Sequence, residues 1–309
     1  MSDHLKGLLI TGLGVLLVVP DSLFVRLIDA SAITIAFWRS LLCAAVIAVG
    51  VLLFQGPRVF RELFRFGPWL WLYVVTVGSA GYLFVLAVSL TSVANVVFII
   101  AAMPAFAALT SWLILGERPS RRTALTIFVV MIGIAVIAVG SGETAQASLA
   151  GDLAALGVAI VFAIALTTAR KLKASSMVPV IPIAYFGAAA VLYPFAEPLA
   201  VASDDWPLVF LHGGVFIAAA TALITLGPRY LPSAEVALLI LLESVLAPIL
   251  AWAVLGENPG RWALFGGALV ISALAVSNAV ALKRRRRVPV SPGTAAAPPL
   301  SPRREDDTP

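Results

Sequence analysis

Long apolar runs recur along this sequence and limit the solvents in which the chain can fold. Runs of about 18 residues or more extend from Leu8 nearly to Leu282, each long enough to cross the roughly 30 Å hydrocarbon core of a bilayer as a helix. With 61% hydrophobic and 12% charged residues, a water-soluble globule would be covered in apolar surface. The runs do not alternate polar with apolar residues, so they predict transmembrane helices and not a barrel.

Glycines, prolines and charge clusters divide these runs into ten predicted spans. The spans lie near residues 7–25, 32–54, 68–89, 92–115, 122–140, 150–170, 179–199, 207–227, 232–255 and 262–282. The first run ends in Val-Val-Pro-Asp-Ser without a small-residue cleavage site, so it is interpreted as a first helix and not as a signal peptide.

Charges in the predicted loops indicate how the spans are oriented. With the N-terminus inside, nearly all lysines and arginines fall in cytoplasmic segments, while Arg26 and Arg261 fall outside and Arg39 lies within a span. Most acids, Asp21 among them, fall on the outer side. We therefore expect both termini to be cytoplasmic. Residues 283–309, basic and then rich in proline, serine and alanine, predict a disordered cytoplasmic tail.

An internal repeat divides the chain into two halves. A shift of 140 residues places Leu-Gly-Glu-Arg-Pro-Ser-Arg (115–121) on Leu-Gly-Glu-Asn-Pro-Gly-Arg (255–261), identical at five of seven positions, and Asn95 on Glu235. The halves, 1–145 and 146–282, hold five spans each, and because five is odd they insert in opposite orientations. The predicted fold is an all-α polytopic membrane protein with two inverted five-helix repeats around a central cavity, a plan that secondary transporters use.

These patterns resemble the drug/metabolite transporter superfamily, specifically its ten-helix members with two EamA-like halves. The resemblance rests on the duplicated Leu-Gly-Glu-x-Pro, Phe37-Trp38-Arg39, Gly133, Gly151-Asp152-Leu153-Ala154, Leu242-Glu243 and Gly266-Gly267-Ala268-Leu269-Val270-Ile271. Ser244 departs from the family's common proline, although Pro104 keeps it in the first half. The first span also lacks the mid-helix glutamate of the four-helix multidrug members.

The resemblance implies a secondary transporter of the inner membrane that exports or exchanges small metabolites by alternating access. The closest class by general pattern is the amino-acid exporters, including those for aromatic amino acids. Multidrug and nucleoside or nucleotide-sugar transport are alternatives within the same fold. The implied partners are a small-molecule substrate and membrane lipids, with no cofactor and no nucleic acid. Monomer or homo-oligomer, and proton coupling or facilitated exchange, both stay open.

Four titratable side chains at predicted membrane depth are candidates for the site, because charge is costly there. Glu243 lies mid-span, where apolar surroundings favour its neutral form; it could couple protons, bind a substrate ammonium group, or simply bond a neighbouring helix. Glu235 could contact substrate or only complement a helix N-terminus. Arg39 could bind a carboxylate, or an acid or carbonyl on a neighbouring span. His212 could relay protons or serve as a packing group.

Less polar candidates complete the predicted site. Ser79, Tyr82 and Ser89 share a helical face that could line a cavity or pack closely against a neighbour. The symmetry between Asn95 and Glu235 places Asn95 and Phe98 at the interface of the halves. Aromatic walls could come from Trp38, Phe162, Tyr185 and Phe216, and helix pivots from Pro104 and Pro248.

Other classes of membrane protein fit the sequence less well. A membrane-embedded enzyme would need a cluster of catalytic groups near one face, and two histidines, one cysteine (Cys43) and unpaired acids do not supply it. The same shortage argues against a metal site or a disulfide framework. No phosphate-binding glycine loop is present for ATP-driven transport. A channel is distinguished from a carrier by kinetics and not by sequence.

Overall fold

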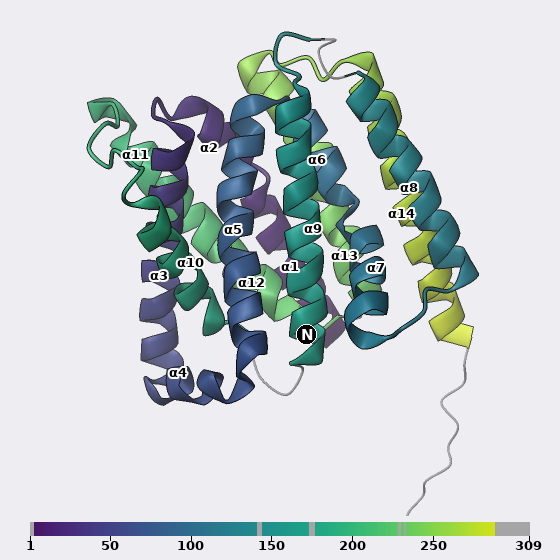
Figure 1. The fold of residues 1–309 in the computed structure, drawn as a ribbon, viewed down its shortest axis with the longest axis horizontal. Helices are drawn as coiled ribbons and strands as arrows, with labels where there is room; N and C mark the ends of the chain where they lie inside the picture. The colour runs from purple at the N-terminus through teal and green to yellow at the C-terminus, as the bar shows by residue number, and fades with distance from the viewer. Residues whose placement is uncertain (1–2, 141–143, 173–176, 228–229, 232, 288–309) are drawn as a thin grey trace, which may run out of the picture.

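The computed structural model describes residues 3–140, 144–172, 177–227, 230–231 and 233–287, and regular structure in this part of the chain is helical throughout (Figure 1). The first half comprises α1 (Asp3–Val18), α2 (Asp21–Leu27), α3 (Ala32–Gln55), α4 (Arg58–Leu63), η1 (Phe64–Phe66), α5 (Pro68–Leu90), α6 (Val93–Ala101), α7 (Met103–Leu115) and α8 (Arg121–Val139). The second comprises α9 (Leu149–Lys171), α10 (Val180–Leu192), η2 (Ser203–Asp205), α11 (Trp206–Val209), the π-helical η3 (Phe210–Ile217), α12 (Ala218–Leu226), α13 (Ser233–Leu255) and α14 (Arg261–Arg287).

Eight helical segments of the described chain are long and apolar enough to cross a membrane. They coincide with eight of the predicted spans, and shorter apolar helices, Val180–Leu192 and Leu239–Leu255, occupy the seventh and ninth. The seventh helix ends at Leu192 and not at the predicted residue 199. Pro194 and Pro198 explain the difference, because proline lacks an amide hydrogen and disfavours helix in the residue before it. Of the predicted tail, residues 283–287 continue α14 and 288–309 lie outside the described residues.

Two of the long spans are broken near a proline. Pro20 separates α1 from α2 and places Asp21 in the first turn of α2. Ala102 separates α6 from α7, and Pro104 lies in the first turn of α7, where its missing amide hydrogen costs no helical bond. Asp21, where the first predicted span was expected to fray, is 2% exposed, because the short second helix turns it into the protein.

The repeated Leu-Gly-Glu-x-Pro motif ends a helix in both halves. Gly116 follows α7 with φ of 72° and Gly256 follows α13 with φ of 67°. These left-handed conformations suit glycine, and they stop the helix by closing its last carbonyls. The motif therefore turns the chain identically at two places, and each glutamate follows directly.

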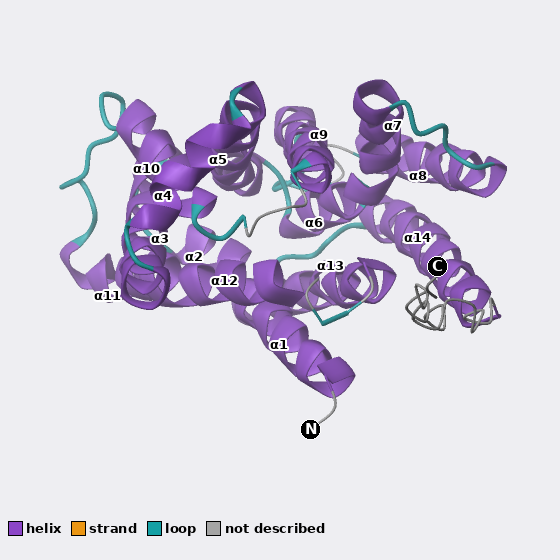
Figure 2. Cartoon of the chain, turned by 90° about the horizontal axis from the view of Figure 1, so that it is seen from below, coloured by secondary structure: helices purple, strands orange, loops and turns teal. Residues whose placement is uncertain are grey.

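Helices related by the repeat pack in related ways. The second helices of the two halves, α3 and α10, pack together, and so do the last ones, α8 and α14. The contact of α5 with α9 is repeated by that of α12 with α1. Seen from one end, the helices form two rows, with α5, α9 and α7 on one side and α12 and α13 on the other (Figure 2).

The helices run between two ends of the molecule. We call the end where α1 begins and α14 finishes the proximal end, and the opposite one, which carries α2 and the start of α9, the distal end (proximal at the bottom of Figure 1). The seam between α5 and α13 is bridged by α2 and α6, since each of these contacts both.

Candidate functional site

Three buried ionisable side chains meet between α2, α3 and η3, and we call Asp21, Arg39 and His212 the central cluster. Asp21 Oδ1 and Oδ2 accept bonds of 3.1 and 2.7 Å from Arg39 Nε and Nη2. His212 Nε2 lies 2.6 Å from Asp21 Oδ1. All three are nearly inaccessible to solvent, and such burial is tolerable only because the bidentate pair offsets the desolvation of its charges. The acid partner expected for Arg39 is thus Asp21.

Aromatic rings hold this cluster in place. The Phe24 ring stacks on His212 with centroids 5.3 Å apart and contacts the Phe216 ring at 5.1 Å. The Phe84 ring lies 5.6 Å from the centre of the Arg39 guanidinium, a cation–π distance. A ring on each side limits water and fixes the planes of the guanidinium and the imidazole.

One nitrogen of Arg39 remains open to a further partner. Nη1 is buried and has no hydrogen-bond partner among the described residues. It faces α5 and α10, since a Cβ added at Gly81 would lie 3.1 Å from Nη1 and 3.3 Å from the Tyr185 ring. A buried guanidinium donor without a partner is unusual, and it suits an anionic group that comes and goes.

Glu243 lies on α13, which packs against α2, the helix that carries Asp21 of the central cluster. Its side chain is partly exposed, unlike the three residues of the cluster. The structure thus brings together Arg39, His212, Tyr185 and Glu243 of the predicted site. The region around the central cluster thus contains both the Arg39 guanidinium and the Glu243 carboxyl group.

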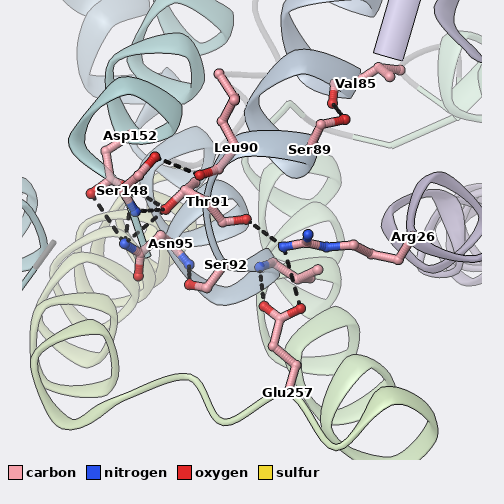
Figure 3. Close-up of polar contacts among 11 residues, drawn as sticks. Arg26, Val85, Ser89, Leu90, Thr91, Ser92, Asn95, Ser148, Asp152 and Glu257 are labelled. Carbon is pink, nitrogen blue, oxygen red and sulfur yellow. Dashed lines mark hydrogen bonds and ion pairs between the residues drawn. The ribbon is translucent and has the colours of Figure 1, made fainter. Parts of the chain in front are cut away.

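A second polar network lies at the distal end, as Figure 3 shows. Asn95 Nδ2 donates to both oxygens of Asp152, at 2.9 and 3.1 Å, and Thr91 Oγ1 donates to Asp152 Oδ1 at 2.8 Å. Ser148 Oγ donates to the carbonyl of Leu90. These bonds join the start of α6 in one half to the start of α9 in the other. Asn95 therefore lies between the halves.

An ion pair extends this distal network (Figure 3). Glu257 Oε1 accepts a 2.6 Å bond from the backbone amide of Val93, and its Oε2 lies 3.6 Å from Arg26 Nη2. Arg26 also donates to the carbonyl of Thr91 at 2.8 Å.

The proximal end carries an ion pair and a further short polar contact. Arg170 Nη2 donates to Glu117 at 3.1 Å, and Arg170 Nη1 donates to Ser111. Glu235 lies 2.7 Å from His4 Nε2. Glu235 is thus placed at the proximal surface and not beside Glu243.

Other predicted residues are not brought to the central cluster. Ser79 and Ser89 donate to carbonyls of their own helix, and Trp38 Nε1 donates to the Pro198 carbonyl while its ring meets Trp206. Tyr82 and Phe162 pack at the edge of the largest apolar core. Phe98 and Pro248 line an apolar crevice of about 510 Å³ between α6, α13 and α14.

Sequence reasoning missed Asp21, Asp152 and Glu257 as buried polar partners. Asp21 and Asp152 lie just inside predicted span ends and Glu257 just outside one, and all three were counted only as acids of the outer side. The repeated glutamate carried a usable signal, because a motif that stops a helix does not itself require a carboxylate. No group of three or more His, Cys, Asp or Glu that could hold a metal is found among the described residues.

Apolar helices of membrane-spanning length, packed as a duplicated bundle around buried charge, define a polytopic membrane protein. The EamA-like transporter family matches residues 5–139 and again 149–279. The chain therefore belongs to that family and is a membrane transporter of the drug/metabolite type.

A solved structure described only as "Crystal structure of protein" shares the fold, with a TM-score of 0.62 at 19% identity, over 92% of this chain and 100% of that one. A search of curated proteins finds no match.

Proposed function

We propose that this protein is a secondary transporter that exports or exchanges amino acids across the inner membrane by alternating access. Its substrate site lies where Glu243 faces the central cluster. The proposal includes ten spans, in two inverted halves at 1–145 and 146–282, with both termini cytoplasmic and residues 283–309 as a cytoplasmic tail. The related packing of the halves and the loop charges support this arrangement.

The observation that carries the substrate class is the Arg39 Nη1 atom, which has no hydrogen bond within the described residues, with Glu243 on α13, the helix packed against α2 of the central cluster. A zwitterionic amino acid presents a carboxylate and an ammonium group on one carbon. The guanidinium can bind the first through Nη1, the nitrogen that Asp21 does not contact, and Glu243 can bind the second. Tyr185, Phe84 and Phe216 supply aromatic surface for the side chain of the substrate.

Counterflow in proteoliposomes tests this function. Vesicles loaded with an unlabelled amino acid should take up the labelled one with saturable kinetics, whereas unsaturable conductance would indicate a channel. In competition, the parent amino acid should compete, and its N-acetyl and carboxamide derivatives should not, because each lacks one of the two charges. Competition only by nucleosides, sugars or cationic drugs would replace the substrate class and leave the carrier mechanism standing.

The Glu243→Gln variant tests the site itself. Losing the carboxylate should lower counterflow by about tenfold or more, the effect of one charged hydrogen bond. Glu62→Gln, which removes an exposed acid of α4, is the matched control and should transport normally. Wild-type uptake by Glu243→Gln at every pH between about 5 and 8 would remove Glu243 from both coupling and substrate binding.

A further inference from the structure

The glutamate of Leu-Gly-Glu-x-Pro occurs twice, and both copies form an ion pair with an arginine of the opposite half. Glu117 and Glu257 are 140 residues apart, as are the ends of the two family matches at 139 and 279. Their partners, Arg170 and Arg26, are 144 residues apart, as are the starts of those matches at 5 and 149. The two ion pairs are therefore one contact, repeated at the two ends of the molecule.

Each pair joins the halves at one end. Arg26 lies at the end of α2 in the first half, and Glu257 follows α13 in the second. Arg170 lies in the last turn of α9 in the second half, and Glu117 follows α7 in the first. Because the halves are inverted copies, the first pair is distal and the second proximal.

The two pairs differ in burial although their chemistry is the same. The Glu257 and Arg26 side chains are 6% and 22% exposed, and the Glu117 and Arg170 side chains are 54% and 51% exposed. On the proposed mechanism, this difference corresponds to a seam between the halves that is closed distally and open proximally.

The buried Glu257–Arg26 pair also forms hydrogen bonds with backbone groups between α5 and α6. Glu257 accepts the Val93 amide, and Arg26 donates to the Thr91 carbonyl, so both bind the short turn between α5 and α6. The repeat mate of Thr91 is Leu231, 140 residues on. The bonds of Arg170 in this structure go to Ser111 and Glu117 instead.

We infer that Glu257–Arg26 and Glu117–Arg170 are reciprocal latches, each buried with the adjoining turn when its own end of the transporter is closed. This rests on the proposed alternating access and adds the residues that set which end is open. In the opposite state, Glu117 and Arg170 become buried and Arg170 reaches the carbonyl of Leu231, while Glu257 and Arg26 become solvated. These four are positioning residues, since they lie away from the central cluster.

Thiol labelling tests the latches without any substrate. Cys43 is the one cysteine of the chain, so Cys43→Ala gives a cysteine-free background. Ala94→Cys then reports on the distal end, because Ala94 is 2% exposed and follows Val93. In purified protein, Glu257→Gln should raise the rate of labelling by a hydrophilic maleimide about tenfold, since a hydrogen bond to a charged group shifts an equilibrium by about that factor.

The repeat supplies the matched control. Glu117→Gln removes the same group from the same motif and should leave distal labelling at or below the starting rate. Combining the two substitutions should bring labelling back toward that rate, because both states then lose a latch. A general loosening would instead raise labelling in both single variants and further in the double one.

Two outcomes would overturn the inference: equal labelling in the two single variants, or none of the expected rise in Glu257→Gln. If Glu257→Gln does not purify as a folded protein, Arg26→Gln should raise distal labelling in its place, because it removes the other charge of the same pair, and unchanged labelling there counts against the latch. The proposed function fails separately. If amino-acid counterflow is absent but Glu257→Gln still raises labelling, the proposed substrate is wrong and the latches stand. If counterflow is normal but labelling does not rise, the latches are wrong and the proposed substrate stands.

Discussion

The two ends of the molecule and its centre differ in how they use the sequence repeat. At the ends, the Glu257–Arg26 pair has a counterpart of identical residue types in Glu117–Arg170. The centre has no such counterpart. At the spacing of 144 that relates the two arginines, the mates of Asp21 and Arg39 are Ala165 and Ile183, which belong to an apolar cluster with its partly buried margin.

On the proposed mechanism this difference has a physical reason. A rocking transporter must make the same closing contact at both ends, so a duplicated ion pair serves both states. It needs only one substrate site, and two buried ionic clusters would double the desolvation cost without binding more substrate. The central cluster therefore occurs once, although the helices around it are arranged as two related halves.

Of the substitutions considered, removal of the Asp21 carboxylate from the central cluster should lower the free energy of unfolding most. Asp21→Ala leaves Arg39 and His212 buried without their acceptor, and breaking a buried pair costs about 3–5 kcal/mol. We expect that loss in the free energy of unfolding, measured by denaturant titration in detergent. Asp204→Ala, an exposed acid of η2, should change it little. Equal small losses in both variants would mean that the central cluster contributes no more than a surface group.

The stability of the two end pairs should differ despite their common motif. Glu257→Gln weakens a buried charged bond to the Val93 amide and should cost about 1.5–3 kcal/mol. Glu117→Gln affects an exposed pair and should cost about 1 kcal/mol or less. Chemical denaturation of both variants side by side measures the difference. A larger loss for Glu117→Gln would reverse the assignment of the closed end.

Much of the helix arrangement was predictable from the sequence, because span length and the repeated motif are local features of the chain. Apolar length predicted the eight long spans, and the repeated Leu-Gly-Glu-x-Pro predicted that its two copies do equivalent work. Span length cannot detect a bend such as that at Pro20. It therefore gave a single span over residues 7–25 and did not show that Asp21 begins a second helix.

The central cluster depends on long-range pairing, which a single sequence does not display. Asp21 and His212 are 191 positions apart, and no local pattern links them. Arg39 was identified because charge is rare within a span, and its need for an acid followed from the cost of burial. Which acid supplies it depends on packing. The unequal burial of Glu117 and Glu257 was equally invisible, because their motifs match.

The symmetric frame itself depends on close contact between α8 and α14. A Cβ added at Gly133 would lie 2.6 Å from Val270 and 2.9 Å from the Gly266 carbonyl. Gly133→Ala should therefore cost about 1–3 kcal/mol through overpacking. Gly50→Ala, at a helical position with open space, should be neutral or stabilising by about 1 kcal/mol. Thermal unfolding in detergent compares the two, and a stabilised Gly133→Ala would show that these helices can separate freely.

The smallest effect is expected on the hydroxyl face of α5, which neither the centre nor the ends use. Ser89 is exposed and donates to the Val85 carbonyl of its own helix, so its hydroxyl has no role in joining the halves. Ser89→Ala should change the free energy of unfolding by about 0.5 kcal/mol or less. Its counterflow KM should equal that of the wild type, with Glu62→Gln as the neutral reference. A raised KM at unchanged stability would place Ser89 on the substrate path, and the site would then extend from the central cluster along α5 toward the distal end.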